Sequence, residues 1–312
     1  MNNMIWLIRR EIWENRSLWI APLVVAGVIL IAAAFGGMHI QGKDSFSFGW
    51  NPETGAELSA QDRESIHNAI GSVAQEKKQL IYAIALSALT SVLLFVMVIV
   101  LFFYLLDCLL AERKDRSILF WKSLPVSDTQ VVLSKLFTAA VLAPVFVLVV
   151  SSVLQAVVSL AWSVRFSGSP LGEVMVVWDG PTWLQLQAAY LLFLTAGILW
   201  YLPLMAYLML VSVWARRNAF LWAVLPPVSV LAIEGLILQS NNFGEFLGRR
   251  FIGIFELLEQ GARGANEDAP TLGDVLHTIS GVLTSAETWL GVLVAAAMIF
   301  GAIRIRRFRD DS

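Results

Sequence analysis

The stretch LLAERKDRSILFWKSLPVSDTQVVLSKLF, residues 109–137, separates two long apolar runs of this chain. Its charges are followed by a bulky apolar turn, residues 118–121, that belongs to neither run. Pro125 disfavours helix at the residue before it, whereas Ser127 followed three residues later by Gln130 is the pattern of a helix-starting capping box. The segment therefore predicts a helix leaving the first run, an apolar turn, and a new helix that enters the second run.

The composition on either side of this segment is that of a membrane protein. Of the 312 residues, 57% are hydrophobic and 15% are charged, and the mean hydropathy is +0.70. A bilayer core takes about 20 apolar residues in a helix. The stretches that reach or approach this length are 18–38, 80–106, 136–163, 184–213, 219–238 and 286–303. The sequence thus predicts an all-α polytopic membrane protein with six transmembrane helices in a single domain, residues 1–312.

Two further helices are expected outside these spans. Ile5, Ile8 and Ile12 recur at helical spacing beside arginines, which predicts an interfacial helix within residues 1–17. Between the last two spans, apolar residues between Phe243 and Leu258 recur on one helical face. This pattern predicts an amphipathic outer helix that lies on, or dips into, the membrane.

The basic residues are unevenly divided between the connections. Fourteen of the 22 Lys and Arg residues fall in the N-terminal segment, the loop 107–135, the turn at Arg216 and Arg217, and the C-terminal tail. Lysine and arginine gather on the cytoplasmic side of membrane proteins. Both termini and the loop 107–135 are therefore expected to be cytoplasmic. The net charge of −2 leaves no excess of positive charge for a nucleic-acid partner.

No set of residues supports an enzyme reading. Gly37, Gly42 and Lys43 approach a nucleotide-binding loop, but Asp44 stands where Ser or Thr is required, and the segment follows a transmembrane helix on the outer side. The three histidines have no metal-ligand spacing. We therefore expect no catalytic residue, metal site or cofactor in this chain.

Glu234 is the one carboxylate well inside a predicted span. An ionisable group at such a place is by default a functional hypothesis, here a substrate contact or a proton step. The alternative is that Glu234 pairs with a neighbouring helix or reaches water near the outer interface. The sequence leaves both readings open.

The loop 109–137 can be interpreted as a docking surface or as a solvated connection. An exposed apolar turn flanked by charges is a surface for docking another protein. Glu112 and Arg116, four residues apart, would pair on the charged rim of that surface. The alternative, a solvated connection, does not account for the presence of Phe120 and Trp121 beside two aliphatic residues.

The spans, the interfacial helix, this loop and the amphipathic stretch resemble a permease subunit of the ABC-2 type ABC transporters. In that family an E-R-x-x-x-[ST] stretch is followed by an L-P-V-S or S-P-V-S turn and a lysine. The matching residues here are Glu112, Arg113, Ser117, Leu124, Pro125, Val126, Ser127 and Lys135. The sequence departs from the commoner form at residues 114–116, where a glycine often stands.

The resemblance implies a membrane subunit of an ATP-driven exporter. The loop would act as a coupling helix that contacts a cytoplasmic ATPase subunit, and that partner would hold the ATP and Mg. A second permease subunit, identical or not, would complete the membrane path. The residues implied in ATPase contact are Glu112, Arg113, Arg116, Ser117, Phe120, Trp121, Leu124 and Pro125.

The expected location is the cytoplasmic membrane of a bacterium. Two other functions remain open. One is a non-transporting sensor or immunity module coupled to the same kind of ATPase. The other is an ATP-independent secondary carrier that uses Glu234. The substrate and the choice between homodimer and heterodimer cannot be read from the sequence.

Overall fold

The computed structural model describes residues 3–35, 37–40, 46–49, 75–115, 126–165, 180–263 and 272–308. The elements in chain order are α1 (Asn3–Glu14), α2 (Ser17–Phe35), β1 (Gly37–Ile40), β2 (Phe46–Gly49), α4 (Gln75–Asp107), α5 (Leu110–Lys114), α7 (Asp128–Phe137), η1 (Thr138–Leu142), α8 (Ala143–Arg165), α10 (Gly180–Trp214), α11 (Ala219–Ile233), η2 (Glu234–Leu238), α12 (Asn242–Arg263), α13 (Leu272–Thr284) and α14 (Ala286–Phe308).

The described helices are long and apolar enough for a multi-pass membrane protein. Five of them could cross a bilayer by length and composition, and a sixth is added if α1 and α2, which meet at a bend of 51°, count as one span. The chain is therefore a helical membrane protein, as its composition predicts.

The helix bounds agree closely with the apolar stretches. The predicted span 219–238 coincides with α11 and η2, while α4 and α10 extend the predicted spans by a few residues at their ends. The first span was predicted too long, because α2 ends at Phe35 and Met38 belongs to β1. β1 pairs antiparallel with β2, with Gly37 opposite Gly49. This hairpin and helix α13 were not predicted.

The predicted capping box at the start of α7 is confirmed. The Ser127 hydroxyl accepts a hydrogen bond from the Gln130 amide, and the Gln130 side chain accepts one from the Ser127 amide. From there α7, η1 and α8 form one continuous path. The wider turn of η1 ends two residues before Pro144, which lacks the N–H that would bond to the Ala140 carbonyl.

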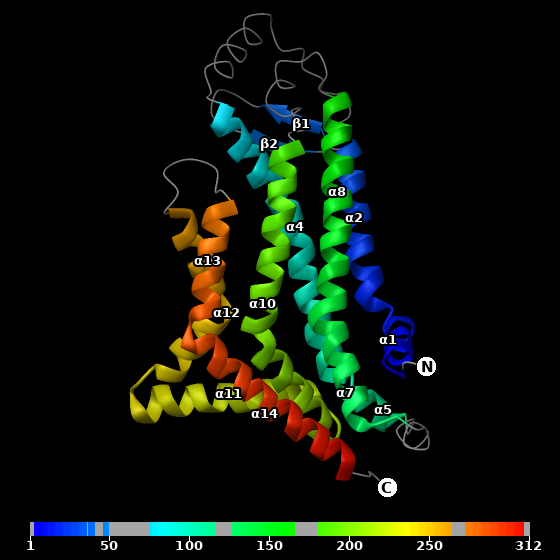
Figure 1. The fold of residues 1–312 in the computed structure, drawn as a ribbon, viewed down its shortest axis with the longest axis vertical. Coiled ribbons are helices and arrows are strands. Elements are labelled where there is room, and N and C mark those ends of the chain that lie inside the picture. The colour runs from blue at the N-terminus through cyan, green and yellow to red at the C-terminus, as the bar shows by residue number, and fades with distance from the viewer. Residues whose placement is uncertain are drawn as a thin grey trace, which may run out of the picture.

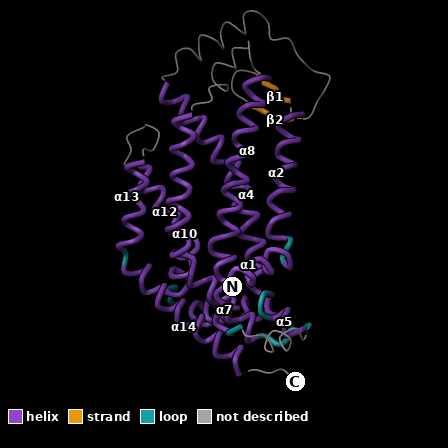
Figure 2. Tube along the Cα trace, turned by 45° about the vertical axis from the view of Figure 1, so that its right-hand side comes forward, coloured by secondary structure: helices purple, strands orange, loops and turns teal. Residues whose placement is uncertain are grey.

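Figure 1 shows α2, α4, α8 and the upper part of α10 running side by side along the long axis of the molecule. The β1–β2 hairpin lies at one end of this bundle. Helices α1, α5 and α7 lie at the other end, together with both ends of the described chain, and Figure 2 agrees. The two flanks of the loop, α5 and α7, are thus on the same side as both ends of the described chain, as the basic residues predict. Which side faces the cytoplasm stays a prediction.

Helix α11 has a different direction from the other apolar helices. Figure 1 shows it lying across the long axis, near the end that holds α5 and α7. Its apolar residues are largely exposed, among them Phe220, Leu225 and Val228. Helices α12 and α13 then form a hairpin beside α10, and α14 runs obliquely along α10 to the C-terminal side. Length and composition allow α11 to cross a bilayer, but its direction does not match the helices of the bundle.

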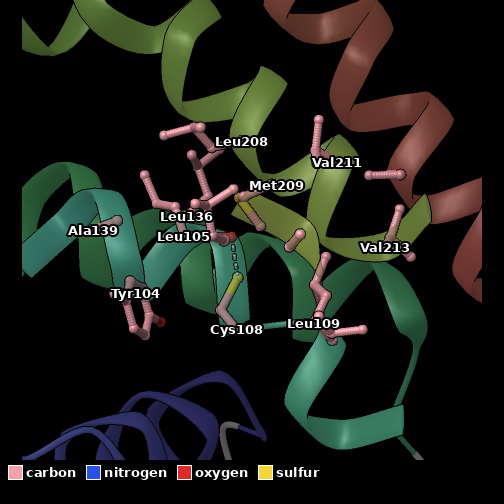
Figure 3. Close-up of a cluster of buried hydrophobic side chains, with 14 of the residues drawn as sticks. Tyr104, Leu105, Cys108, Leu109, Leu136, Ala139, Leu208, Met209, Val211 and Val213 are labelled. Carbon is pink, nitrogen blue, oxygen red and sulfur yellow. Dashed lines mark hydrogen bonds between the residues drawn. The ribbon is translucent and has the colours of Figure 1, made fainter. Parts of the chain in front are cut away.

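The largest hydrophobic core lies at the α5–α7 end. There the ends of α4 and α10 meet α7 and η1 through Leu105, Leu109, Leu136 and Met209, each at most 9% exposed (Figure 3). Cys108 lies in the same cluster and donates a hydrogen bond to the Leu105 carbonyl. The core holds both flanks of the loop against the bundle.

Candidate functional site

A cluster of buried charges lies where the loop leaves and re-enters the bundle. Glu112 of α5, which is 6% exposed, is at its centre. Its carboxylate accepts hydrogen bonds from Arg10 Nη2 at 2.5 Å and Arg306 Nη1 at 2.6 Å, and Lys135 Nζ lies 3.2 Å away. One carboxylate therefore joins side chains from α1, α7 and α14.

Two more acids complete the set. Glu11 of α1 accepts hydrogen bonds from Lys135 Nζ at 2.6 Å, from the Tyr104 hydroxyl at 2.9 Å and from Asn15 Nδ2 at 3.0 Å. Asp128, in the first turn of α7, accepts one from Arg306 Nε at 3.0 Å. The charge cluster thus comprises Arg10, Glu11, Glu112, Asp128, Lys135 and Arg306.

The charge cluster is balanced, with three acids and three bases. Lys135 and Arg306 are each 2% exposed and Glu11 is 1% exposed, so these charges have left water. The desolvation of a buried charge is repaid only where the pairing geometry is good and the remaining polar atoms are bonded. Removing one member would leave the opposite charge in excess among buried groups, which is why the charge cluster fixes how α1, α5, α7 and α14 meet.

Arg113 fastens the same loop to a different helix. Its Nη2 donates to the carbonyls of Ser212 at 2.8 Å and Ala215 at 2.6 Å, at the C-terminal end of α10. The Ser212 hydroxyl in turn accepts from the amides of Leu109 and Leu110, both at 3.1 Å. These bonds satisfy carbonyls that a helix end leaves free. Glu112 therefore ties the loop to α1, α7 and α14, whereas the adjacent Arg113 ties it to the end of α10.

The prediction that Glu112 lies on an exposed charged rim is wrong, because the charge cluster encloses its carboxylate. The remaining residues implied in ATPase contact lie outside the described residues: Arg116, Ser117, Phe120, Trp121, Leu124 and Pro125. The expected pairing of Glu112 with Arg116 and the apolar turn fall in that segment too. Contact of any of these residues with a partner stays a prediction.

Sequence reasoning missed four members of the charge cluster, namely Arg10, Glu11, Asp128 and Arg306. It assigned the two arginines to the cytoplasmic side by count and gave Glu11 and Asp128 no role. One signal was present: Lys135 stands directly before an apolar run and needs an acid nearby if it is buried. The sequence does not say which acid, because the partners are 124 and 23 residues away.

A groove of about 1170 Å³ opens beside the charge cluster. Its apolar lining includes Ile99 and Phe103 of α4 and Phe220 and Leu221 of α11. Charged and polar residues complete the lining: Glu14, Asn15, Asp107, Glu112, Lys114, Asp115, Lys135, Arg217 and Asn218. The groove is therefore apolar on two walls and charged at its border.

Glu234 is 7% exposed and lies at the start of η2. Its two carboxylate oxygens accept hydrogen bonds from the Phe243 amide at 3.0 and 2.9 Å, and one of them also accepts from the Ser240 hydroxyl at 3.1 Å. Phe243 belongs to the first turn of α12, whose amides have no partner within the helix. Between them Gln239 turns the chain with a φ of 47°. Glu234 thus caps the following helix, which supports the structural reading of this residue.

Glu234→Ala should expose the first turn of α12 to solvent exchange, because it removes the carboxylate that caps the Phe243 amide. Loss of a capping side chain costs about 0.5–2 kcal/mol. Glu234→Gln keeps an acceptor oxygen and should lose less. Hydrogen exchange of residues 242–246 measures this effect. Unchanged protection in Glu234→Ala would reject the capping role, whereas transport lost in Glu234→Gln with protection intact would support a proton or substrate role instead.

A scan against protein-family models and searches of curated proteins and of solved structures found no match to this chain.

Proposed function

We propose that this chain is the membrane subunit of an ATP-driven exporter and that a separate ATPase docks on the loop between α5 and α7. The observation that carries the proposal is the position of Arg306, which bonds to Glu112 on one flank of the loop and to Asp128 on the other. A force applied to residues 116–125 would reach α14 through both flanks of the loop, α5 and α7. The resemblance of this loop to the ABC-2 type permeases indicates that a docked ATPase would apply this force.

The charge cluster would carry the movement inward. Glu112 links the loop to α1 through Arg10, and Lys135 links α7 to α1 through Glu11. Arg113 links the loop to the end of α10. Charge-assisted bonds of this kind are short and strong, so α1, α7, α10 and α14 would move with the loop rather than slip past it.

The groove gives the proposal a substrate class. Its apolar walls and charged border match a molecule with an apolar body and a polar end, such as one that leaves the lipid leaflet at this end of the bundle. Pockets that take small molecules are mostly apolar with a few placed polar groups. We assign the binding of an amphiphilic substrate to this groove.

The other two functions fare differently. A non-transporting sensor or immunity module would use the same loop and the same charge cluster, so it remains the second candidate. A secondary carrier needs Glu234 free to bind a proton or substrate, whereas its carboxylate already bonds to the Phe243 amide and Ser240. That observation disfavours the carrier.

Purification of the full chain from native membranes in mild detergent should retain a cytoplasmic ATPase subunit, and the complex in sealed vesicles should move an amphiphilic substrate only with ATP present. ATPase binding without transport would favour the sensor or immunity module. Transport that follows a proton gradient without ATP would reject the proposal in favour of the carrier.

A further inference from the structure

Arg250 of α12 is a buried cation that pairs with no acid among the described residues. It is 7% exposed, and its Nη2 atom is buried and donates no hydrogen bond. Within the described parts of the chain, no carboxylate lies within 4.0 Å of its guanidinium. Burial of a charge without a partner is costly. Some feature of the protein must offset this cost or use it.

Part of the cost is offset by Trp200 of α10. The guanidinium carbon of Arg250 lies 4.8 Å from the centre of the Trp200 ring, in the geometry of a cation–π interaction. Two further bonds hold α12 at this place, since Trp200 Nε1 donates to the Arg250 carbonyl at 3.0 Å and the Tyr201 hydroxyl donates to the Phe251 carbonyl at 3.1 Å. An aromatic face remains a weaker partner for a buried cation than a carboxylate.

The guanidinium occupies a notch that exists because residue 291 of α14 is glycine. A Cβ added at Gly291 would collide with Arg250 Nη2, and it would lie 3.0 Å from Arg250 Cζ and 3.1 Å from Pro203 Cγ. Pro203 is the residue inside α10 that lacks a helical N–H. The notch thus joins α12, α14 and the proline of α10.

The acid that Arg250 lacks lies one helical turn away on the same face of α14. Glu287 precedes Gly291 by four residues, which is about 6 Å along a helix. Its side chain is half-buried. Burial lowers the pKa of the Arg250 guanidinium, and the charge of Glu287 opposes that lowering. Glu287 is therefore close enough to act on Arg250 but not to bond to it.

From this geometry we infer that Arg250 is a switch with two positions on α14: the Gly291 notch seen here, and an ion pair with Glu287 one turn nearer the start of that helix. Moving between them requires the long side chain to swing, or the α12–α13 hairpin to slide along α14 by one turn. A slide of one packed element past another by one helical turn is a known kind of shift.

The switch would couple the position of the α12–α13 hairpin to the packing around Pro203 in α10. In the first position the guanidinium fills the space between Pro203 and Gly291, and in the second that space is vacated beside the proline. The inference depends on the packing of α10, α12 and α14 alone, so it stands or falls independently of the proposed export function.

The test is the thermal stability of the purified full chain in detergent. Gly291→Ala should expel the guanidinium, which can pair with Glu287, so the melting temperature should change little. Glu287→Gln should also change little, because the notch is then still open. In the double variant, the Arg250 guanidinium can occupy neither the notch at residue 291 nor an ion pair with residue 287. Its melting temperature should fall by at least about 3 °C more than the two single changes together.

Two controls complete the test. Gly301→Ala, on the same helix, meets only Leu210 Cδ1 at an ordinary 3.5 Å and should show no such coupling with Glu287→Gln. In an Arg250→Met background, the coupling between Gly291→Ala and Glu287→Gln should vanish.

Additive melting-temperature changes would overturn the inference. So would a Gly291→Ala chain that fails to fold where its Arg250→Met counterpart folds, since the guanidinium would then have no second position. A rise in melting temperature on addition of inorganic phosphate that Arg250→Met abolishes would assign the unpaired guanidinium to a bound anion and would likewise overturn it.

Discussion

Glu112→Ala should be the most destabilising single substitution that we predict for this chain. It removes the carboxylate shared by Arg10, Lys135 and Arg306 and leaves three cations together, two of them 2% exposed. Breaking a buried pair by deleting one partner costs about 3–5 kcal/mol. The expected results are a large drop in melting temperature in detergent and a low yield of folded protein.

Glu14→Ala is the matched control for Glu112→Ala. Glu14 also pairs with Arg10, at 2.9 Å, but its side chain is 50% exposed. Exposed ion pairs contribute about 0–1 kcal/mol, so this variant should melt close to the parent. Adding Arg306→Met to Glu112→Ala removes one of the three excess cations and should recover part of the loss, because Asp128, the other partner of Arg306, is partly exposed. Equal melting temperatures for Glu112→Ala and Glu14→Ala would show that the charge cluster does not hold these helices together.

If the chain is the membrane subunit of an exporter as proposed, Phe120→Ala with Trp121→Ala should abolish transport while leaving the chain folded. If these aromatic side chains are the anchors of the ATPase interface, truncating each should cost about 1–2 kcal/mol of docking or more, as interface hot spots do. Both residues lie between α5 and α7, outside every apolar stretch, and the substitutions leave the Ser127 capping box in place. The ATPase should be lost on purification in detergent, and the melting temperature of the chain itself should not change.

Trp13→Ala is the control for that pair. Trp13 is an aromatic residue of α1, 65% exposed, at the same end of the bundle. Its truncation should leave the ATPase bound, since α1 is expected to lie at the membrane interface rather than under the partner. If the double variant at 120 and 121 keeps full ATPase association and full transport, the turn is not the docking element and the solvated connection is the correct reading of the loop.

The two experiments separate anchoring from docking within one short segment. Glu112 should affect the fold and, through it, everything else, whereas Phe120 and Trp121 should affect only the partner. From the sequence alone, Glu112 was expected on an exposed rim, where its loss would cost less docking energy than loss of the aromatic anchors; its burial adds a large expected cost to folding.

Local features of the fold could be predicted from the sequence. The bounds of α11 and η2 coincide with the apolar stretch 219–238, because the length of an apolar run is written in consecutive residues. The capping box of Ser127 and Gln130 needs only two residues three apart. The hairpin of β1 and β2 was missed although each strand alternates apolar and polar residues, because each run is only four residues long and its pairing depends on the register with the other.

The candidate site was predictable only in part. The sequence by itself determined that the chain is built of membrane helices and that a charged segment containing the apolar residues 118–121 separates two of them, because composition and spacing act over neighbouring residues. Only the tertiary structure decided that Glu112 faces Arg10 and Arg306, that Glu234 caps α12, and that α11 lies across the bundle. Those outcomes depend on which helix ends meet, and Glu112 and Arg306 are 194 residues apart in the chain. A buried charge requires some partner, but the packing of whole helices selects which one it receives.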